Sequence, residues 1–173
     1  MSLKVRDLIY RRYKKELRGY VDEERDLLIT KFFVHFPFNS LGIHGLNHVY
    51  QVLKNGLTLA EETGADKSVV ILFAVFHDCA RDWDGPDHAH GARGAIVAEK
   101  LRHNGFYELD EDRLEKLVYA CKYHTDGFVS SDPTIGTCWD ADRLDLVRVG
   151  ITPAPFKMST QAAKEKCNYG YHG

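Results

Sequence analysis

The sequence predicts an all-α protein with a single domain. Its 173 residues match the usual size of one domain and are enough to bury a sizeable hydrophobic core. Hydrophobic residues make up 44% of the chain and charged residues 28%, which is the balance of an ordinary globular protein. Apolar residues recur with a helical period through most of the chain, and no segment alternates in the way that a strand does.

Successive segments show this helical period, and turn residues separate them. The expected helices span residues 3–17, 22–36, 47–63, 67–79, 88–103, 110–123 and 135–149, with a short piece near 160–167. Their ends carry residues that start and stop helices: Asp22 and Asp110 are caps, and Gly19 and Gly64 are stops. The segment 67–79 is apolar on most sides, which predicts a buried helix at the centre of the fold.

The charge balance excludes some partners. The chain has 23 basic and 25 acidic residues, a net charge of -2 and a pI near 6.5, so nothing draws it in bulk to nucleic acid or to an anionic membrane. The longest apolar run, Val69–Phe76, is far shorter than the roughly 20 residues that span a bilayer. No apolar core of a signal peptide is present near Met1. We therefore expect a soluble, cytoplasmic protein with no membrane partner and no strong sign of a nucleic-acid partner, whose oligomeric state is open.

The four cysteines are widely spaced. No Cys-x-x-Cys pair occurs, so the sequence suggests neither a zinc knuckle nor a disulfide framework. We expect reduced thiols, mostly buried, at Cys79, Cys121, Cys138 and Cys167.

Nine histidines require an explanation, because histidine is the commonest metal ligand and the usual acid or base at neutral pH. His77 and Asp78 close the apolar segment 67–79. A carboxylate at the C-terminal end of a helix opposes the helix dipole, and its burial without a partner costs several kcal/mol. The sequence therefore predicts a cation beside Asp78.

Acidic residues also interrupt the last long helix, 135–149, where Asp140, Asp142 and Asp145 stand among apolar positions. His48 lies on the inward face at the start of another helix, so its ring can point toward the core. Histidine nitrogens and carboxylate oxygens together suit divalent metal ions. The pattern predicts a metal site built from separate core helices.

This ordered pattern of a histidine, a His-Asp pair and a distant aspartate resembles the HD superfamily of metal-dependent phosphohydrolases. It is carried here by His48, His77-Asp78 and the stretch Ala141-Asp142-Arg143-Leu144. The segments 44–48 and 73–78 are similar to the opening helix and the signature helix of that superfamily. The similar region runs from about residue 44 to 148. The resemblance implies an HD-type helical bundle, a single domain over residues 1–173, that holds one or two divalent ions.

The same resemblance implies a ligand set for a first ion. It consists of His48, His77, Asp78 and Asp142, with Asp140 as the rival of Asp142. The ion would be Mn, Mg, Fe, Zn, Co or Ni.

Two further histidines extend the resemblance to members that hold two ions. Asp78 would then bridge, with His90 and His124 on the second ion. His88 is the alternative to His90, and His44 is expected beside the ligands rather than on an ion.

One position departs from the family pattern. In some one-metal relatives a glutamate three residues after the Asp of the pair helps to activate water, whereas this chain has Arg81 there. Asp82 or Asp84 could take that role, so the expected catalytic residues are Asp78, Asp82 and Arg81. The planar fork of Arg81 would also suit a substrate phosphate.

Further cations near the motifs are expected phosphate contacts. They are Lys122 and Arg143, together with Arg81, and Arg93 is a weaker choice. Arg143 has an alternative as an ion-pair partner of Asp140 or of Asp145.

Three functions from different classes follow. The first is a phosphohydrolase whose partner is a small phosphorylated substrate, a nucleotide or another phosphate ester. The second is a di-iron oxygenase of the HD type, which the longer ligand set with His90 and His124 keeps open. The third is a metal-binding regulatory domain without turnover, which the departure at Arg81 permits.

Overall fold

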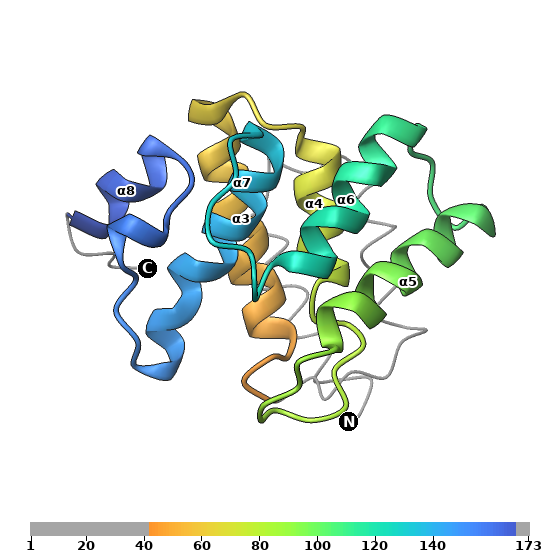
Figure 1. The fold of residues 1–173 in the computed structure, drawn as a ribbon, viewed down its shortest axis with the longest axis horizontal. Helices are drawn as coiled ribbons and strands as arrows, with labels where there is room; N and C mark the ends of the chain where they lie inside the picture. Colours follow the sequence, from red (N-terminus) through yellow and green to blue (C-terminus); the bar gives the residue numbers. More distant parts are fainter. Residues whose placement is uncertain (1–41, 169–173) are drawn as a thin grey trace.

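The computed structural model describes residues 42–168, and this part of the chain is all helical, as the sequence predicts (Figure 1). No strand occurs within this range. The expected helices at 3–17 and 22–36 lie outside it. The elements are α3 (Leu46–Thr63), α4 (Lys67–Phe76), α5 (His90–His103), α6 (Glu111–Tyr123), α7 (Pro133–Leu144), the 3-10 helices η1 (Asp145–Val149) and η2 (Pro155–Lys157), and α8 (Gln161–Asn168).

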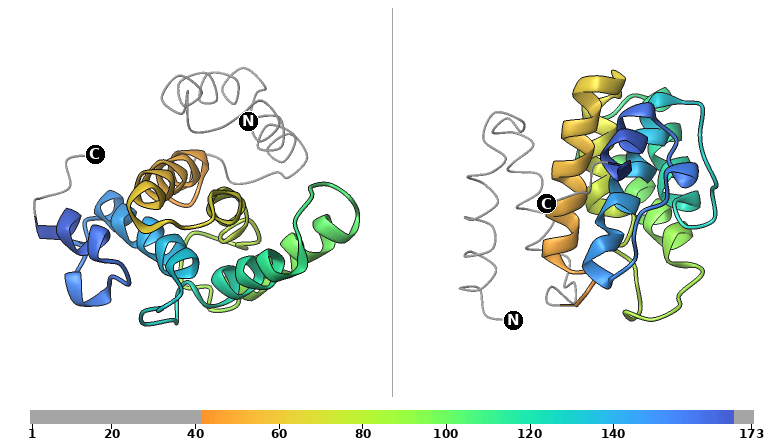
Figure 2. Two further views of the ribbon diagram at one scale, coloured as in Figure 1. Left: turned by 90° about the horizontal axis from the view of Figure 1, so that it is seen from above. Right: turned by 90° about the vertical axis from the view of Figure 1, so that its left-hand side faces the viewer.

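Helix α4 is the centre of the fold. Every residue of Val69–Phe76 is buried, and α4 contacts α3, α5, α6 and α7 (Figures 1 and 2). Helix α7 packs along α3, and α5 packs along α6, so the two pairs cover α4. These buried residues form one hydrophobic core, in agreement with a single domain. No helix within residues 42–168 has the length and the apolar content that a bilayer crossing needs.

Short polar side chains begin the helices. The carboxylate of Asp66 accepts hydrogen bonds from the backbone N–H groups of Ser68 and Val69, and Asp110 caps α6 in the same way, as expected. Asp132 caps α7 ahead of Pro133, so α7 begins before the expected start at 135. Gly64 ends α3 in the left-handed region, with a φ of 69°.

Three helix boundaries differ from the expectation. Helix α4 ends at Phe76 rather than near 79, because the chain turns at His77 and Asp78. Helix α5 begins at His90 rather than at 88. The expected helix 135–149 is α7 followed by the tighter η1, since the last turns of helices often take 3-10 geometry. The structure also adds η2, which no sequence pattern predicted.

Glycines allow α5 to approach its neighbours closely. A Cβ at Gly94 would lie 3.0 Å from the carbonyl oxygen of His77 and even closer to that of Phe76. A Cβ at Gly91 would lie 2.6 Å from the carbonyl oxygen of Cys121. These are backbone atoms that cannot move aside alone. The two glycines therefore set the separation of α5 from α4 and α6, on which the site depends.

Candidate metal centre

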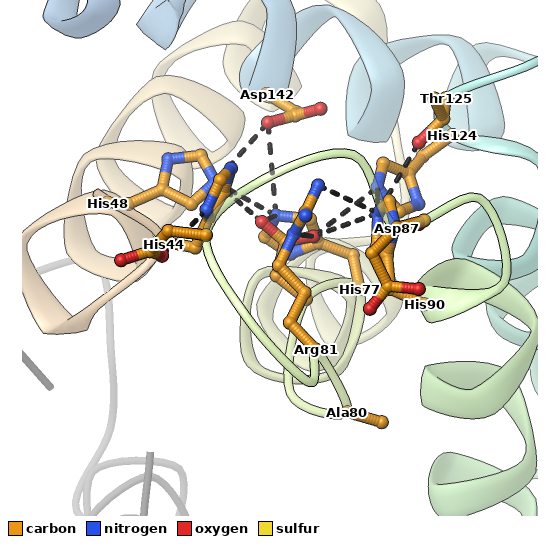
Figure 3. Close-up of polar contacts among 12 residues, drawn as sticks. His44, His48, His77, Ala80, Arg81, Asp87, His90, His124, Thr125 and Asp142 are labelled. Atoms are coloured by element: carbon orange, nitrogen blue, oxygen red, sulfur yellow. Dashed lines mark hydrogen bonds and ion pairs between the residues drawn. The ribbon is translucent and has the colours of Figure 1, made fainter. Parts of the chain in front are cut away.

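The predicted metal ligands come from separate helices and meet at one end of the bundle (Figure 3). His48 lies near the start of α3, and His77 and Asp78 follow α4. His90 begins α5, His124 follows α6, and Asp142 lies in α7. The histidines and Asp78 are at most 5% exposed, while the Asp142 side chain is 19% exposed. Groups this polar are found inside proteins only when other groups compensate them.

The first ligand set contains His48, His77, Asp78 and Asp142. Nε2 of His48 lies 3.1 Å from Nε2 of His77. The same nitrogen lies 3.4 Å from Oδ2 of Asp78 and 3.4 Å from Oδ1 of Asp142. Nε2 of His77 lies 3.6 Å from Asp78 Oδ2 and 3.8 Å from Asp142 Oδ1. Two nitrogens and two carboxylate oxygens thus surround one point.

The second ligand set shares Asp78 with the first. Nε2 of His90 lies 2.9 Å from Nε2 of His124, and these nitrogens lie 3.1 and 3.6 Å from Asp78 Oδ1. Asp78 therefore presents Oδ2 to one set and Oδ1 to the other. Two groups could each hold a metal ion, His48 with His77 and Asp78, and Asp78 with His90 and His124, since within each group the donor atoms lie within 4.8 Å of one another.

Each histidine ring has its other nitrogen fixed by an acceptor. Nδ1 of His77 lies 3.1 Å from the carbonyl oxygen of Phe73, and Nδ1 of His124 lies 2.7 Å from that of Cys121. Nδ1 of His90 bonds to the carbonyl oxygen of Asp87. A carbonyl only accepts, so Nδ1 carries a proton in these rings, and Nε2 is the nitrogen that faces the site. This is the arrangement that metal-binding histidines adopt.

The carboxylates around His48 favour a positive charge at the first ligand set. Burial alone would lower the pKa of His48, but hydrogen bonds to Asp142, Asp145 and Asp78 raise it to about 10. Burial lowers the pKa of His77 to about 4, so this ring is neutral at pH 7. Although burial disfavours their charged forms, the neighbouring histidines hold the pKa values of Asp78 and Asp142 below the usual range. Two ionised carboxylates therefore face a cationic position, which a proton on His48 or a divalent ion can fill.

The donor set of both groups suits the same metals. Imidazole nitrogens with carboxylate oxygens favour Mn, Fe, Co, Ni or Zn over the all-oxygen sites of Mg and Ca. The fixed Nδ1 donors and the two facing Nε2 lone pairs fit a divalent ion in each set. The residues present are thus compatible with one or with two ions.

The structure separates the rivals Asp140 and Asp142. Asp140 is fully buried and points away from the histidines: its carboxylate accepts bonds from the backbone N–H groups of Ser159 and Thr160, at 2.7 Å each, and from the Thr160 hydroxyl. It fastens the segment ahead of α8 to α7. Of the two carboxylates, only Asp142 faces His48 and His77.

Sequence reasoning missed the role of Asp145. Its Oδ2 lies 2.7 Å from Nδ1 of His48, and Arg148 lies 3.3 Å from the same oxygen. A carboxylate in this position orients a ligating ring and increases its basicity. The signal was present in the spacing, since residues three apart share a helix face and Asp145 follows Asp142 by three.

We expect Asp145→Ala to weaken ion binding at the first ligand set by about 10- to 100-fold, the usual cost of losing such a partner. The His48 ring would lose the acceptor that fixes its orientation. Competition against a fluorescent chelator measures this affinity. Asp112→Ala, which removes an exposed carboxylate in the first turn of α6, is the matched control and should leave the affinity unchanged. Equal affinities in the two variants would contradict the role of Asp145.

Two residues expected at the site lie away from it. Asp82 is exposed and pairs with Arg93 at 3.2 Å, so the structure does not support it as the group that activates water. Its rival Asp84 bonds instead to Nδ1 of His44 at 3.0 Å. Lys122 is exposed, with its ammonium 5.0 Å from the centre of the Tyr123 ring, and it does not line the cavity described below.

Of the remaining candidate residues, some lie at the ligand sets and others have structural contacts. His88 is exposed, whereas its rival His90 is buried in the second ligand set. Arg143 donates to the carbonyl oxygens of Gly127, Phe128 and Lys157, which corrects the expected ion pair with Asp140 or Asp145. These bonds hold the loop after α6 against the segment before α8. Its main contacts are therefore structural, although it also lines the cavity.

A cavity of about 430 Å³ opens beside the ligands. Its floor includes Asp78 and Asp142, and its cationic walls include Arg81, Arg148 and Lys157. The side chain of Arg81 reaches Asp78, with Nε 3.0 Å from Oδ1, and so supplies the cation that the end of α4 was predicted to need. The outer wall includes Phe128. The arrangement places a negatively charged floor next to cations that can bind an anion.

The four cysteines of the chain are free, as expected. Cys121 and Cys138 are fully buried in the core, while Cys79 and Cys167 are partly exposed. Burial raises the pKa of Cys79 to about 12, so this thiol stays protonated beside Asp78.

Comparison with known proteins agrees with this geometry. The fold is similar to the crystal structure of a protein described as a predicted HD superfamily hydrolase from an uncultured Thermotogales bacterium, with a TM-score of 0.61 and 21% sequence identity over 84% of this chain and 82% of that chain. A search of curated proteins gives no match. The sequence model of the HD domain matches residues 45–147, which is more than half of the chain and includes every residue of both ligand sets. The chain therefore belongs to the HD domain family.

Proposed function

We propose that this protein is a divalent-metal-dependent phosphohydrolase that acts on a nucleotide or another small phosphate ester. The observation that carries the proposal is the pair of ligand sets that share Asp78 and open onto a cavity with cationic walls. A phosphate ester is an anion whose reacting group would lie between the ions and Arg81. Hydrolysis would add water across the ester bond and release an alcohol and phosphate.

Each group of the site has a task in this reaction. A bound divalent ion would lower the pKa of a coordinated water to about 7 and polarise the phosphoryl oxygen. His48, His77, Asp78 and Asp142 would hold the first ion, and the partner of His48, Asp145, would keep its ring in place. Arg81 would bind the phosphate oxygens, because its planar fork matches their spacing.

The outer wall of the cavity supports a substrate with an aromatic base. Phe128 lines this wall and is 61% exposed, and its ring centre lies 6.4 Å from that of Phe156, which is 67% exposed. Pro153 and Ala154 add apolar surface nearby. Aromatic side chains left open beside a phosphate-binding wall provide a surface on which a nucleobase stacks.

We expect Phe128→Ala to raise the KM for a nucleoside monophosphate by about tenfold, since base stacking on an aromatic side chain contributes on the order of 1–3 kcal/mol. The KM for glycerol phosphate, which has no ring, should not change. Val129→Ala is the control, because Val129 is also exposed but does not line the cavity. A parallel change in KM for both substrates would argue against stacking at Phe128.

The test of the function begins with protein purified without chelator or metal-affinity resin. Elemental analysis should find one or two divalent ions per chain, and phosphate release from nucleoside monophosphates should stop after chelation and return with added Mn²⁺. Binding of ions without any phosphate release from phosphate esters would favour the regulatory alternative.

The full ligand set keeps a second function open. His90 and His124 complete a site for two ions, and a di-iron oxygenase of the HD type would use the same residues. A content of two iron ions per chain, together with oxygen uptake that depends on this iron, would favour the oxygenase over the hydrolase.

A further inference from the structure

Arg81 already contacts the second ligand set. Its Nε lies 3.0 Å from Oδ1 of Asp78, and one terminal nitrogen lies 3.4 Å from Nε2 of His90 (Figure 3). The other terminal nitrogen donates to the carbonyl oxygen of Gly85 at 3.2 Å. Asp78 Oδ1 and His90 Nε2 are two of the three donor atoms of that set. The guanidinium thus engages the atoms that a second ion would need.

His90 cannot bind Arg81 and a second metal ion at the same time. Its Nδ1 donates to the carbonyl oxygen of Asp87, so Nε2 has a single lone pair directed into the site. Nε2 of His124 lies 2.9 Å from this nitrogen, and the Thr125 hydroxyl and Arg81 each lie 3.4 Å from it. The lone pair can accept a hydrogen bond from one of these groups or bind a metal ion, but not both. The positive charge of Arg81 also lies beside Asp78 Oδ1, where it would repel a second cation.

An anion in the cavity would compete with His90 for the Arg81 guanidinium. Arg81 lines the cavity and lies on the loop between α4 and α5, where it is partly exposed. A phosphate group offers several oxygens to the guanidinium, and such paired, charge-assisted bonds are stronger than a bond to a neutral ring. Binding of phosphate would draw the terminal nitrogen away from His90 and free its lone pair.

We propose that Arg81 is the resident cation of the second ligand set, and that a second ion binds there more tightly once a phosphate group has engaged the Arg81 guanidinium. The inference rests on the proposed function, because the phosphate group belongs to the substrate. It assigns Arg81 two successive partners, His90 in the free protein and the phosphate in the complex. Since coupling between two ligands is reciprocal, the second ion would also tighten the binding of phosphate.

Equilibrium dialysis of the whole chain with Mn²⁺, with and without inorganic phosphate, tests this coupling. The wild-type protein should bind about one ion without phosphate, and phosphate should tighten the second ion by about tenfold, within the usual range of coupling between sites. Arg81→Gln should bind two ions whether or not phosphate is present. Arg102→Gln, which replaces an arginine at the far end of α5, should behave as the wild type.

Other results would overturn the inference. One is that the wild type without phosphate binds both ions with equal affinity. Another is that the affinity for the second ion in Arg81→Gln is the same as in the wild type. Arg81→Met, which removes the charge and the planar fork but keeps a long side chain, provides the same comparison if circular dichroism shows that the glutamine variant is misfolded. It should bind the second ion more tightly than the wild type does without phosphate. Because no step measures hydrolysis, an absence of phosphatase activity would overturn the proposed function and leave the ion counts interpretable.

Discussion

Asp78→Ala is expected to abolish ion binding at both ligand sets and to reduce hydrolysis of a phosphate ester by on the order of a thousandfold, the equivalent of the several kcal/mol that a metal ion contributes. Asp78 is the one residue that the two sets share, with Oδ2 facing His48 and His77 and Oδ1 facing His90 and His124. Loss of this side chain would leave each set without its buried carboxylate.

The comparison variant for this experiment is His124→Ala. It removes a ligand from the second set only, so the protein should keep one ion per chain, measured by elemental analysis. Circular dichroism would show that both variants are folded. If Asp78→Ala kept two ions or turned over substrate at the wild-type rate, the two ligand sets could not be the catalytic site.

Gly94→Ala is expected to lower the free energy of unfolding by about 1–3 kcal/mol, the usual cost of overpacking a well-packed interface. The added methyl group would meet the carbonyl oxygens of Phe76 and His77, which belong to the backbone that ends α4. Helix α5 would have to move outward, and His90 at its start would move with it.

Urea denaturation measures this change, and ion binding at the second ligand set should weaken in the same variant. Glu99→Ala, at an exposed position of α5, is the control and should alter the free energy of unfolding by less than about 0.5 kcal/mol. A Gly94→Ala protein as stable as this control would show that α5 adjusts without strain.

Much of the fold could be predicted because its signals are local. The apolar period and the cap at Asp110 depend on residues close in sequence, and the structure has helices where they indicate them. The ends of α4 and α7 were less predictable. There the chain leaves helical geometry at Asp78 and Asp145, whose side chains contact histidines of other helices.

The site was predictable in its residue types and less so in its orientations. The order of His48, His77, Asp78 and Asp142 drew attention to the residues that the structure brings together. Which way a polar side chain points depends on contacts far along the chain, which a sequence pattern does not contain. For this reason the sequence suggested Asp82 as a catalytic residue, although that side chain is exposed and pairs with Arg93.

The same reason explains what was missed. Asp145 was considered as one of the acidic residues of helix 135–149 and as a partner of Arg143. Its spacing places it on one face with Asp142, but nothing local connects it with His48, a residue 97 positions earlier. Likewise, the contact of Arg81 with His90 depends on the turn of the chain between α4 and α5. The first contact explains how Asp145 positions His48, and the second carries the proposed role of Arg81 in the second ligand set.

The placement of the ligands on separate helices also makes an ion a mechanical part of the protein. An ion held by His48 on α3, by Asp78 after α4 and by Asp142 on α7 would act as a removable cross-link between distant segments. Such a link stabilises the native state by an amount that rises with the logarithm of the ratio of free ion concentration to dissociation constant, about 4 kcal/mol at a thousandfold excess. The free concentration of the metal ion would thus determine the stability of the folded protein as well as the occupancy of the proposed catalytic site.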